Sequence, residues 1–139
     1  MPPRPKASLI DTNSLIRYLM GDDPVQSPAS AAFMYKLEEG TESAEIAESV
    51  VTEAVWTLSS FYEVPRVEVA DKLAAILDFP GVRAPRKKVL MSALARYGAG
   101  TADIVDCLLA ARAAPNRATV ITFDATDFKK LGVQWKKPS

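Results

Sequence analysis

The junction at Asp11, between a short apolar run and an amphipathic helix, constrains the fold of this chain most strongly. Residues 7–10 form a short, mainly apolar run of strand length, and from Ser14 to Met20 the apolar residues recur at helical spacing. Strand followed by helix is the unit of α/β proteins, whose ligands bind outside the carboxyl ends of the strands. Asp11 therefore lies where a site is expected, although an Asp at this place is also a favoured helix N-cap.

The rest of the chain continues the alternation of helices and strands. Hydrophobic periodicity predicts helices over residues 28–39, 49–62, 65–78, 86–97, 102–114 and 127–131. Ser27 and Thr101 are the expected caps of two of them. Strands are predicted over 43–47, 118–122 and 133–135. We expect one domain, residues 1–139, folded as a three-layer α/β/α sandwich around a mainly parallel sheet.

The absence of histidine restricts the chemistry more than the overall composition does. Without histidine, Ser-His-Asp and Cys-His catalysis and His-based zinc sites are excluded. The single cysteine, Cys107, cannot form an internal disulfide, and its apolar neighbours predict a packed side chain. What remains is carboxylate chemistry, and carboxylates prefer hard cations such as Mg²⁺ and Mn²⁺.

Charge and hydropathy do not point to a membrane or to bulk electrostatic binding of nucleic acid. The seventeen acidic and seventeen basic side chains give a formal net charge of zero, so any attraction for nucleic acid must be local. The apolar runs are too short for a membrane span or a signal peptide. We expect a cytoplasmic protein.

Four acidic side chains stand at positions where one bound cation would compensate the charges of all of them. Asp11 and Asp124 follow the two clearest strands, whose carboxyl ends share an edge in a parallel sheet. Glu53, in the middle of a helix, is predicted to border a buried face, and Asp106 lies on the apolar stripe of another helix. Each alone has a structural explanation as a cap, turn former or first-turn acid. A shared metal ion is the hypothesis that accounts for all four.

Three other groups of side chains have interpretations of their own. Four aromatic side chains are predicted to lie in the core: Phe33, Trp56, Phe61 and Phe79. The basic run at residues 86–88 is typical of a solvated helix start. Thr12 and Asn13 are small polar groups that could orient Asp11 or a bound water.

Taken together, four segments resemble the motif blocks of PIN domains, specifically VapC-type toxins: residues 10–13 (IDTN), 52–58 (TEAVWTL), 103–111 (DIVDCLLAA) and 122–128 (TFDATDF). The resemblance implies a magnesium- or manganese-dependent endoribonuclease. In it, Asp11, Glu53, Asp106 and Asp124 match the acidic quartet that holds the metal. It also implies an RNA substrate, a cognate VapB-type antitoxin and a homodimer.

Some assignments stay open at this point. Asp103 lies one turn before Asp106, so either could be the direct ligand, with the other in support. Asp127 could cap the short helix after Asp124. A nuclease also needs bases at the rim of its acidic site to attract RNA, and the candidates are Arg17, Arg86, Lys87, Lys88, Arg96 and Arg112.

Two alternative functions belong to other classes. One is a PIN-like binding module that holds metal or a partner without turnover. The other is a phospho-acceptor receiver domain, which also places an Asp at a strand end, but would need paired acids after the first strand and a lysine after a late one. The late strand here ends in Thr122, Phe123 and Asp124.

Overall fold

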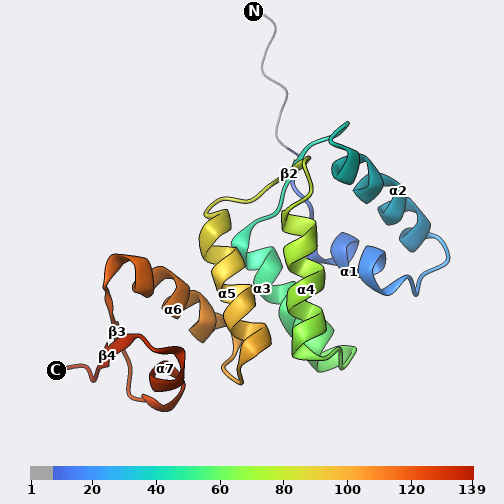
Figure 1. Ribbon diagram of the computed structural model, residues 1–139. Helices are drawn as coiled ribbons and strands as arrows, with labels where there is room; N and C mark the ends of the chain where they lie inside the picture. The colour runs from blue at the N-terminus through green and yellow to red at the C-terminus, as the bar shows by residue number, and fades with distance from the viewer. Residues whose placement is uncertain (1–7) are drawn as a thin grey trace, which may run out of the picture.

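The computed structural model describes residues 8–139, and helices dominate it (Figure 1). The helical elements, in chain order, are α1 (Thr12–Met20), α2 (Gln26–Glu39), α3 (Glu48–Trp56), the π-helical segment η1 (Thr57–Phe61), α4 (Arg66–Leu77), α5 (Lys87–Ala99), α6 (Ile104–Asn116) and α7 (Thr126–Leu131). The strands are β1 (Ala44–Glu45), β2 (Val82–Arg83), β3 (Thr119–Ile121) and β4 (Gln134–Lys136). Within residues 8–139, no helix is long and apolar enough to span a membrane.

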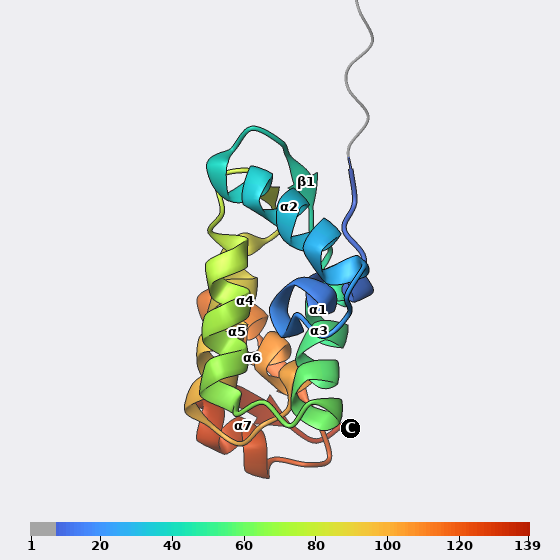
Figure 2. The same ribbon diagram turned by 90° about the vertical axis from the view of Figure 1, so that its right-hand side faces the viewer.

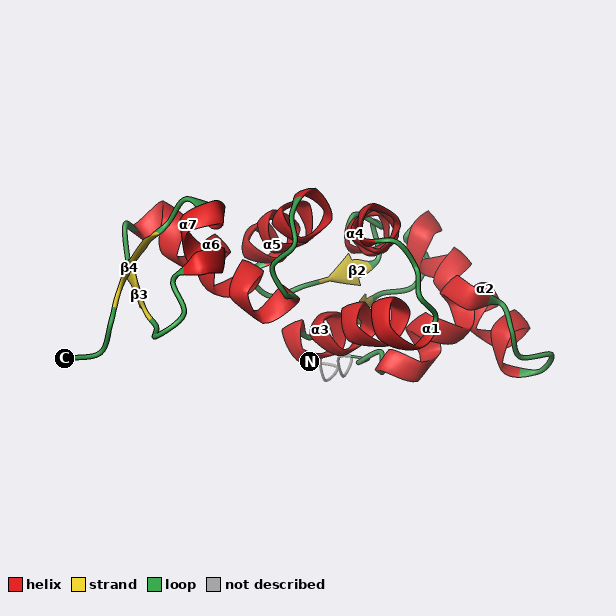
Figure 3. Ribbon diagram, turned by 90° about the horizontal axis from the view of Figure 1, so that it is seen from below, coloured by secondary structure: helices red, strands yellow, loops and turns green. Residues whose placement is uncertain are grey.

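The strands confirm the predicted α/β class and the parallel pairing. β1 pairs with β2 in parallel, and Leu9 adds a parallel bridge to Glu45 on the other side of β1. β3 pairs in parallel with β4, with Val120 opposite Trp135. Across the described residues these are two separate pairs. Figures 1 and 3 place the pair β3–β4 at the end of the molecule opposite α2, away from β2.

The main core lies among the helices. Leucines on α1, η1, α4 and α5 are almost fully buried in one cluster, as Leu15, Leu58, Leu73 and Leu94 show. The helices α4, α5 and α6 pack side by side around it (Figure 2). Ala113, Val120 and Phe128 form a second, smaller cluster under β3 and α7, and Leu131 contacts both clusters. The C-terminal strands therefore rest on α6 rather than on the main core.

Two helix starts differ from the predicted ones, because aspartates bind the free backbone N–H groups. Asp23 Oδ1 accepts from the N–H groups of Val25 (2.9 Å) and Gln26 (2.7 Å), so α2 begins before Ser27. Asp103, not Thr101, caps α6. That helix also continues through Pro115 to Asn116.

The prediction that all four aromatic residues lie in the core is wrong for two of them. Trp56 is 65% exposed and Phe61 is 75% exposed, whereas Phe33 and Phe79 pack against the core. The buried stripe of α3 runs through Val51, Ala54 and Val55 to Leu58, and Trp56 lies one residue beyond it. The wider π-helical turn after Trp56 further breaks the helical spacing on which the prediction rested.

Candidate functional site

Asp11 caps helix α1 and keeps one oxygen free for other partners. Its Oδ1 accepts hydrogen bonds from the backbone N–H of Ser14 (2.9 Å) and from the Ser14 hydroxyl (2.8 Å). These bonds, the backbone one first, lower the pKa of Asp11 below its ordinary value and keep the exposed carboxylate ionised. Oδ2 accepts no hydrogen bond from the described residues. Asp11 is therefore the predicted cap, and its free oxygen still allows it to bind a cation.

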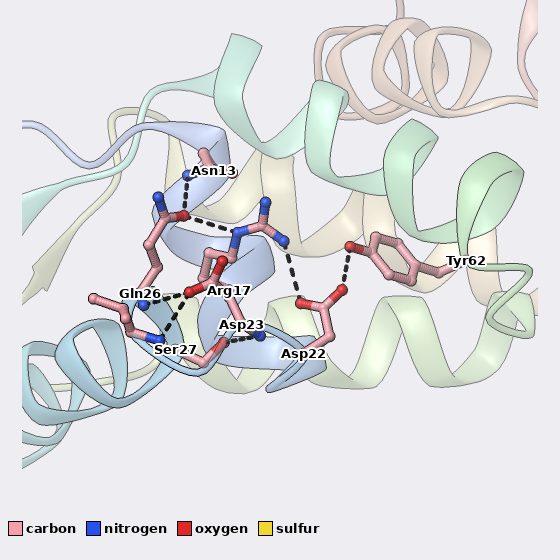
Figure 4. Close-up of polar contacts among 8 residues, drawn as sticks. Asn13, Arg17, Asp22, Asp23, Gln26, Ser27 and Tyr62 are labelled. Atoms are coloured by element: carbon pink, nitrogen blue, oxygen red, sulfur yellow. Dashed lines mark hydrogen bonds and ion pairs between the residues drawn. The ribbon is translucent and has the colours of Figure 1, made fainter.

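The start of α1 is fixed by a polar network, shown in Figure 4. Asn13 Nδ2 donates to Gln26 Oε1 (3.3 Å), which also accepts from Arg17 Nε (3.0 Å). Arg17 Nη1 lies 3.2 Å from Asp22 Oδ1, and the hydroxyl of Tyr62 donates to Asp22 Oδ2 (2.8 Å). Arg17, a predicted base at the rim, is thus already paired with a carboxylate.

Glu53 lies on α3 between the N-termini of α1 and α6. It lines a hollow of about 310 Å³ together with Thr12 and Asn13, the two residues after Asp11. It also lines a larger groove of about 710 Å³ together with Asp103. The expectation that Glu53 borders a buried face is wrong, because its side chain is exposed. Thr12, by contrast, is buried.

Asp106 is half-buried, and the charges of three other aspartates act on it. Burial raises its pKa above the ordinary value, and the charges of Asp103, Asp127 and Asp124 raise it further, in that order. None of the ion pairs within residues 8–139 involves these four side chains. The carboxylates around Asp106 therefore form an uncompensated negative cluster, which is an environment that attracts a cation.

The hydrogen bonds at the two helix starts hold this cluster in place. Asp103 caps α6 and accepts from the backbone N–H of Asp106 at 2.9 Å. Asp124 Oδ1 accepts from the N–H of Thr126 (3.2 Å), at the start of α7. Asp127 follows in the first turn of α7, where it is half-buried.

The predicted acidic quartet is spread over several elements. Asp11 caps α1, Glu53 on α3 lines the groove that Asp103 also lines, and the charges of Asp103, Asp127 and Asp124 act on Asp106 of α6. Across residues 8–139, no three acidic side chains come close enough to hold a metal ion. The donor type fits Mg²⁺ or Mn²⁺, which bind carboxylate oxygens. Leu9 forms an isolated bridge to Glu45 of β1, and among the described residues β3 pairs only with β4, so no shared sheet edge brings Asp11 and Asp124 together.

The remaining candidate bases differ in how far they are engaged. Lys87 forms an ion pair with Asp78 (2.8 Å), whereas Arg86 and Lys88 are exposed at the start of α5. Arg112 is exposed on the wall of the large groove. Arg96 is not a free rim residue, because its Nη1 donates to the backbone oxygen of Leu131 (2.9 Å).

Arg66 is a positioning residue that no sequence pattern singles out. Its Nε donates to the backbone oxygen of Tyr97 (3.0 Å), its Nη2 donates to that of Ala102, and its guanidinium lies 3.8 Å from the centre of the Tyr97 ring. It thereby holds the connection between α5 and α6, directly before the Asp103 cap. These acceptors are backbone atoms more than thirty residues away, so no local pattern reveals them.

Comparison with known proteins decides the family. The family model described as "PIN domain" matches residues 8–134, which is nearly the whole chain. The chain belongs to the PIN domain family. A search of curated proteins found no significant match. PIN domains are generally nucleases that typically use divalent metals, so membership supports a hydrolase acting on nucleic acid and removes the receiver-domain alternative.

Proposed function

We propose that this PIN domain is a Mg²⁺- or Mn²⁺-dependent endoribonuclease and the toxin of a VapBC-type toxin–antitoxin pair. The proposal includes a cognate VapB-type antitoxin, a homodimer, a cytoplasmic location and a single domain over residues 1–139. Its supports are the family match and the presence of all four motif acids at the expected positions.

The observation that carries the metal-dependent chemistry is the setting of Asp106. This half-buried carboxylate lies beside Asp103, Asp124 and Asp127 without an ion pair among the described residues. Carboxylates that are crowded and partly desolvated are destabilised unless a cation compensates them. A divalent ion supplies that compensation, and a binding site is a direct reason for a protein to keep such a cluster.

The four acids have distinct supports. Ser14 binds one oxygen of Asp11, which leaves the other free to bind a ligand. Asp103 fixes the N-terminus of α6 and so positions Asp106. Glu53 and Asp124 are exposed, as Asp11 is, so Asp106 is the half-buried member of the quartet. When bound, the cation would activate a water molecule and neutralise charge on the scissile phosphate.

Exposed basic side chains are the proposed contacts of the RNA backbone. Arg86, Lys88 and Arg112 are exposed and form no ion pair within residues 8–139. Arg17 and Lys87 would first have to exchange Asp22 and Asp78 for a phosphate. We therefore assign the stronger rim contacts to Arg86, Lys88 and Arg112.

The test is RNA cleavage in Mn²⁺ by purified protein and its charge-removal variants. Asp106→Asn and Asp11→Asn should abolish cleavage, and Asp103→Asn should be milder if Asp106 is the direct ligand. The matched control is Asp71→Asn, since Asp71 is exposed on α4 and forms no hydrogen bond or ion pair among the described residues. Circular dichroism checks that each variant is folded. Full activity of Asp106→Asn, or of wild type in excess chelator, would contradict the proposal.

One observation favours a second candidate, a PIN-like binding module without turnover. Among residues 8–139, no three acidic side chains are grouped so that they could hold a metal ion. A module of this kind would bind Mn²⁺ or RNA but leave the RNA intact after prolonged incubation at high protein concentration. The same cleavage assay separates the two functions.

A further inference from the structure

A hollow of about 310 Å³ lies between α1 and the continuous helix formed by α3 and η1. Glu53 of the acidic quartet lines it, so a ligand in this hollow lies beside the proposed reaction. Its other walls include Asn13, Ile16 and Arg17 from α1, and Phe61 and Tyr62 from the end of η1. Apolar walls with a few polar groups are typical of a small-molecule site, and the volume is near the lower end of the usual range of about 300–1,000 Å³.

The ring of Phe61 provides an exposed aromatic wall whose position is restrained. Phe61 is 75% exposed, and its ring packs edge to face on that of Tyr62, with centroids 4.9 Å apart and planes at 77°. The Tyr62 hydroxyl in turn donates to Asp22 Oδ2 (2.8 Å), in the network of Figure 4. An exposed aromatic ring held in this way is the kind of platform on which unpaired nucleic-acid bases stack.

The π-helical turn η1 explains why Phe61 lies at the hollow and not in the core. In a regular α-helix, Phe61 would follow Leu58 by three residues on the same buried stripe. Instead, the N–H of Tyr62 donates to the backbone oxygen of Thr57 (3.2 Å), five residues earlier, and the wider turn shifts Phe61 away from the fully buried Leu58. Single π-helical turns of this kind are frequent at functional sites.

The α1 side of the hollow offers hydrogen-bonding groups that are not yet used. Arg17 donates from Nε to Gln26 and from Nη1 to Asp22, but its Nη2 forms no hydrogen bond within residues 8–139. Asn13 donates from Nδ2 to Gln26 (3.3 Å), and its Oδ1 accepts none from the described residues. The hollow therefore presents both a donor and an acceptor. Nucleobases carry both kinds of group on their edges.

The charges of the hollow favour an uncharged ligand over a phosphate group. The positive charge of Arg17 is compensated by Asp22, 3.2 Å away, and Glu53 adds a negative charge. A phosphate in the hollow would therefore be repelled. An uncharged, planar base avoids this repulsion and gains stacking on Phe61.

We propose that this hollow binds one unpaired base of the RNA substrate, stacked on Phe61 with its polar edge at Asn13 and Arg17. The identification of the ligand as RNA rests on the proposed function. The base belongs to a nucleotide next to the scissile phosphate, because Glu53 lines the hollow and Asp11 lies two residues before Asn13. Stacking accepts any base, whereas hydrogen bonds to the base edge select among bases. Phe61 therefore supplies affinity, and Asn13 and Arg17 supply base preference.

Binding of mononucleotides tests the hollow without any cleavage assay. The probes are the four ribonucleoside 5′-monophosphates, and ribose 5-phosphate is the matched probe that lacks a base. Titrations followed by NMR are carried out in chelator, so that no metal ion contributes to the binding. At least one monophosphate should bind about tenfold more tightly than ribose 5-phosphate, because the stacked base supplies the affinity. The absence of binding for all four monophosphates, or equal binding of ribose 5-phosphate, would overturn the proposal.

Two variants of Phe61 locate the binding. Phe61→Leu should weaken monophosphate binding about tenfold, whereas Phe61→Trp should retain it, because leucine removes the aromatic ring and tryptophan keeps one. Both variants should keep the melting temperature of wild type, since Phe61 is mostly exposed. The matched control is Tyr35→Leu, because Tyr35 is 60% exposed on α2 and does not line the hollow. Equal affinity of wild type and Phe61→Leu would overturn the proposal.

Replacing Asn13 by Ala tests the contact with the edge of the base. The differences in affinity among the four monophosphates should become smaller, because a group that distinguishes their edges is lost, whereas Phe61→Leu should weaken all four. Differences as large as those of wild type would overturn the assignment of Asn13.

Cleavage kinetics separate a failure of the base site from a failure of the proposed function. The substrate is an unstructured oligoribonucleotide that contains all four bases, in Mn²⁺. Phe61→Leu should raise KM about tenfold and leave kcat nearly unchanged, because stacking holds the substrate and the transition state alike. If wild type cleaves and Phe61→Leu has an unchanged KM, the base site is wrong and the nuclease stands. If no RNA is cleaved but Phe61→Leu binds monophosphates more weakly, the base site stands and the proposed nuclease is wrong.

Discussion

Replacing Arg66 by Met should destabilise the fold by loosening the connection between α5 and α6. The guanidinium donates to the backbone oxygens of Tyr97 and Ala102 and lies 3.8 Å from the centre of the Tyr97 ring. Methionine keeps much of the apolar stem but provides no donor. Two buried carbonyl oxygens would lose their charged partner at the point where α6 begins.

The size of the effect follows from these contacts. A hydrogen bond with a charged donor contributes about 1.5–3 kcal/mol, and a cation–π contact contributes about 0.5–2 kcal/mol. Arg66 is only half-buried and its contacts are coupled, so the lower values apply. We expect Arg66→Met to lower the free energy of unfolding by about 2–4 kcal/mol.

Urea unfolding followed by circular dichroism measures this loss, with an unchanged m-value showing that the unfolded state is not altered. The matched control is Arg83→Met, because Arg83 is exposed on β2 and its side chain forms no hydrogen bond or ion pair among the described residues. It should change stability by less than about 0.5 kcal/mol. Equal losses in the two variants would refute the role of Arg66.

Three further predictions concern Tyr62, Gly81 and Cys107. The Tyr62 hydroxyl lowers the pKa of Asp22, and the same hydrogen bond raises the pKa of Tyr62. At pH values between the pKa of Asp22 and the pKa of Tyr62, wild type should therefore be more stable than Tyr62→Phe. The stability difference should disappear as the pH falls through the lowered pKa of Asp22 or rises through the raised pKa of Tyr62. A stability difference independent of pH would contradict this prediction. Gly81→Ala should lower the free energy of unfolding by about 3 kcal/mol or more, because the added Cβ would clash with the backbone oxygens of Glu42 and Leu37. Gly100→Ala is the control, since its added Cβ would meet nothing closer than 3.4 Å. Burial raises the pKa of Cys107 to about 11, so a thiol reagent at pH 8 should label it only in urea, and rapid labelling of the native protein would show that it is accessible.

The sequence predicted the elements well because most of them have local causes. The helical spacing of apolar residues predicted α3 through α6, and the β-branched run predicted β3. The expected small, packed Cys107 is confirmed, since its side chain is fully buried. The strand β2 was not predicted, because Val82 and Arg83 are two residues whose pairing with β1 depends on the tertiary structure.

The site was less predictable because its parts depend on long-range packing. The half-buried position of Asp106 follows from its place on the stripe of α6, as the pattern indicated. The exposure of Glu53 and Trp56 does not follow from the pattern, since it depends on which neighbours cover α3. The pairing of strands is equally non-local, and so the sequence could place Asp11 and Asp124 at strand ends without showing which edges meet.

The measurement that tests the central claim most directly is calorimetric titration of the RNA-free protein with Mn²⁺. If carboxylates of the quartet hold the metal, wild type should bind Mn²⁺ saturably, and Asp11→Asn and Asp106→Asn should each bind at least about tenfold more weakly, while Asp71→Asn matches wild type. Equal affinity in all four proteins would contradict the account.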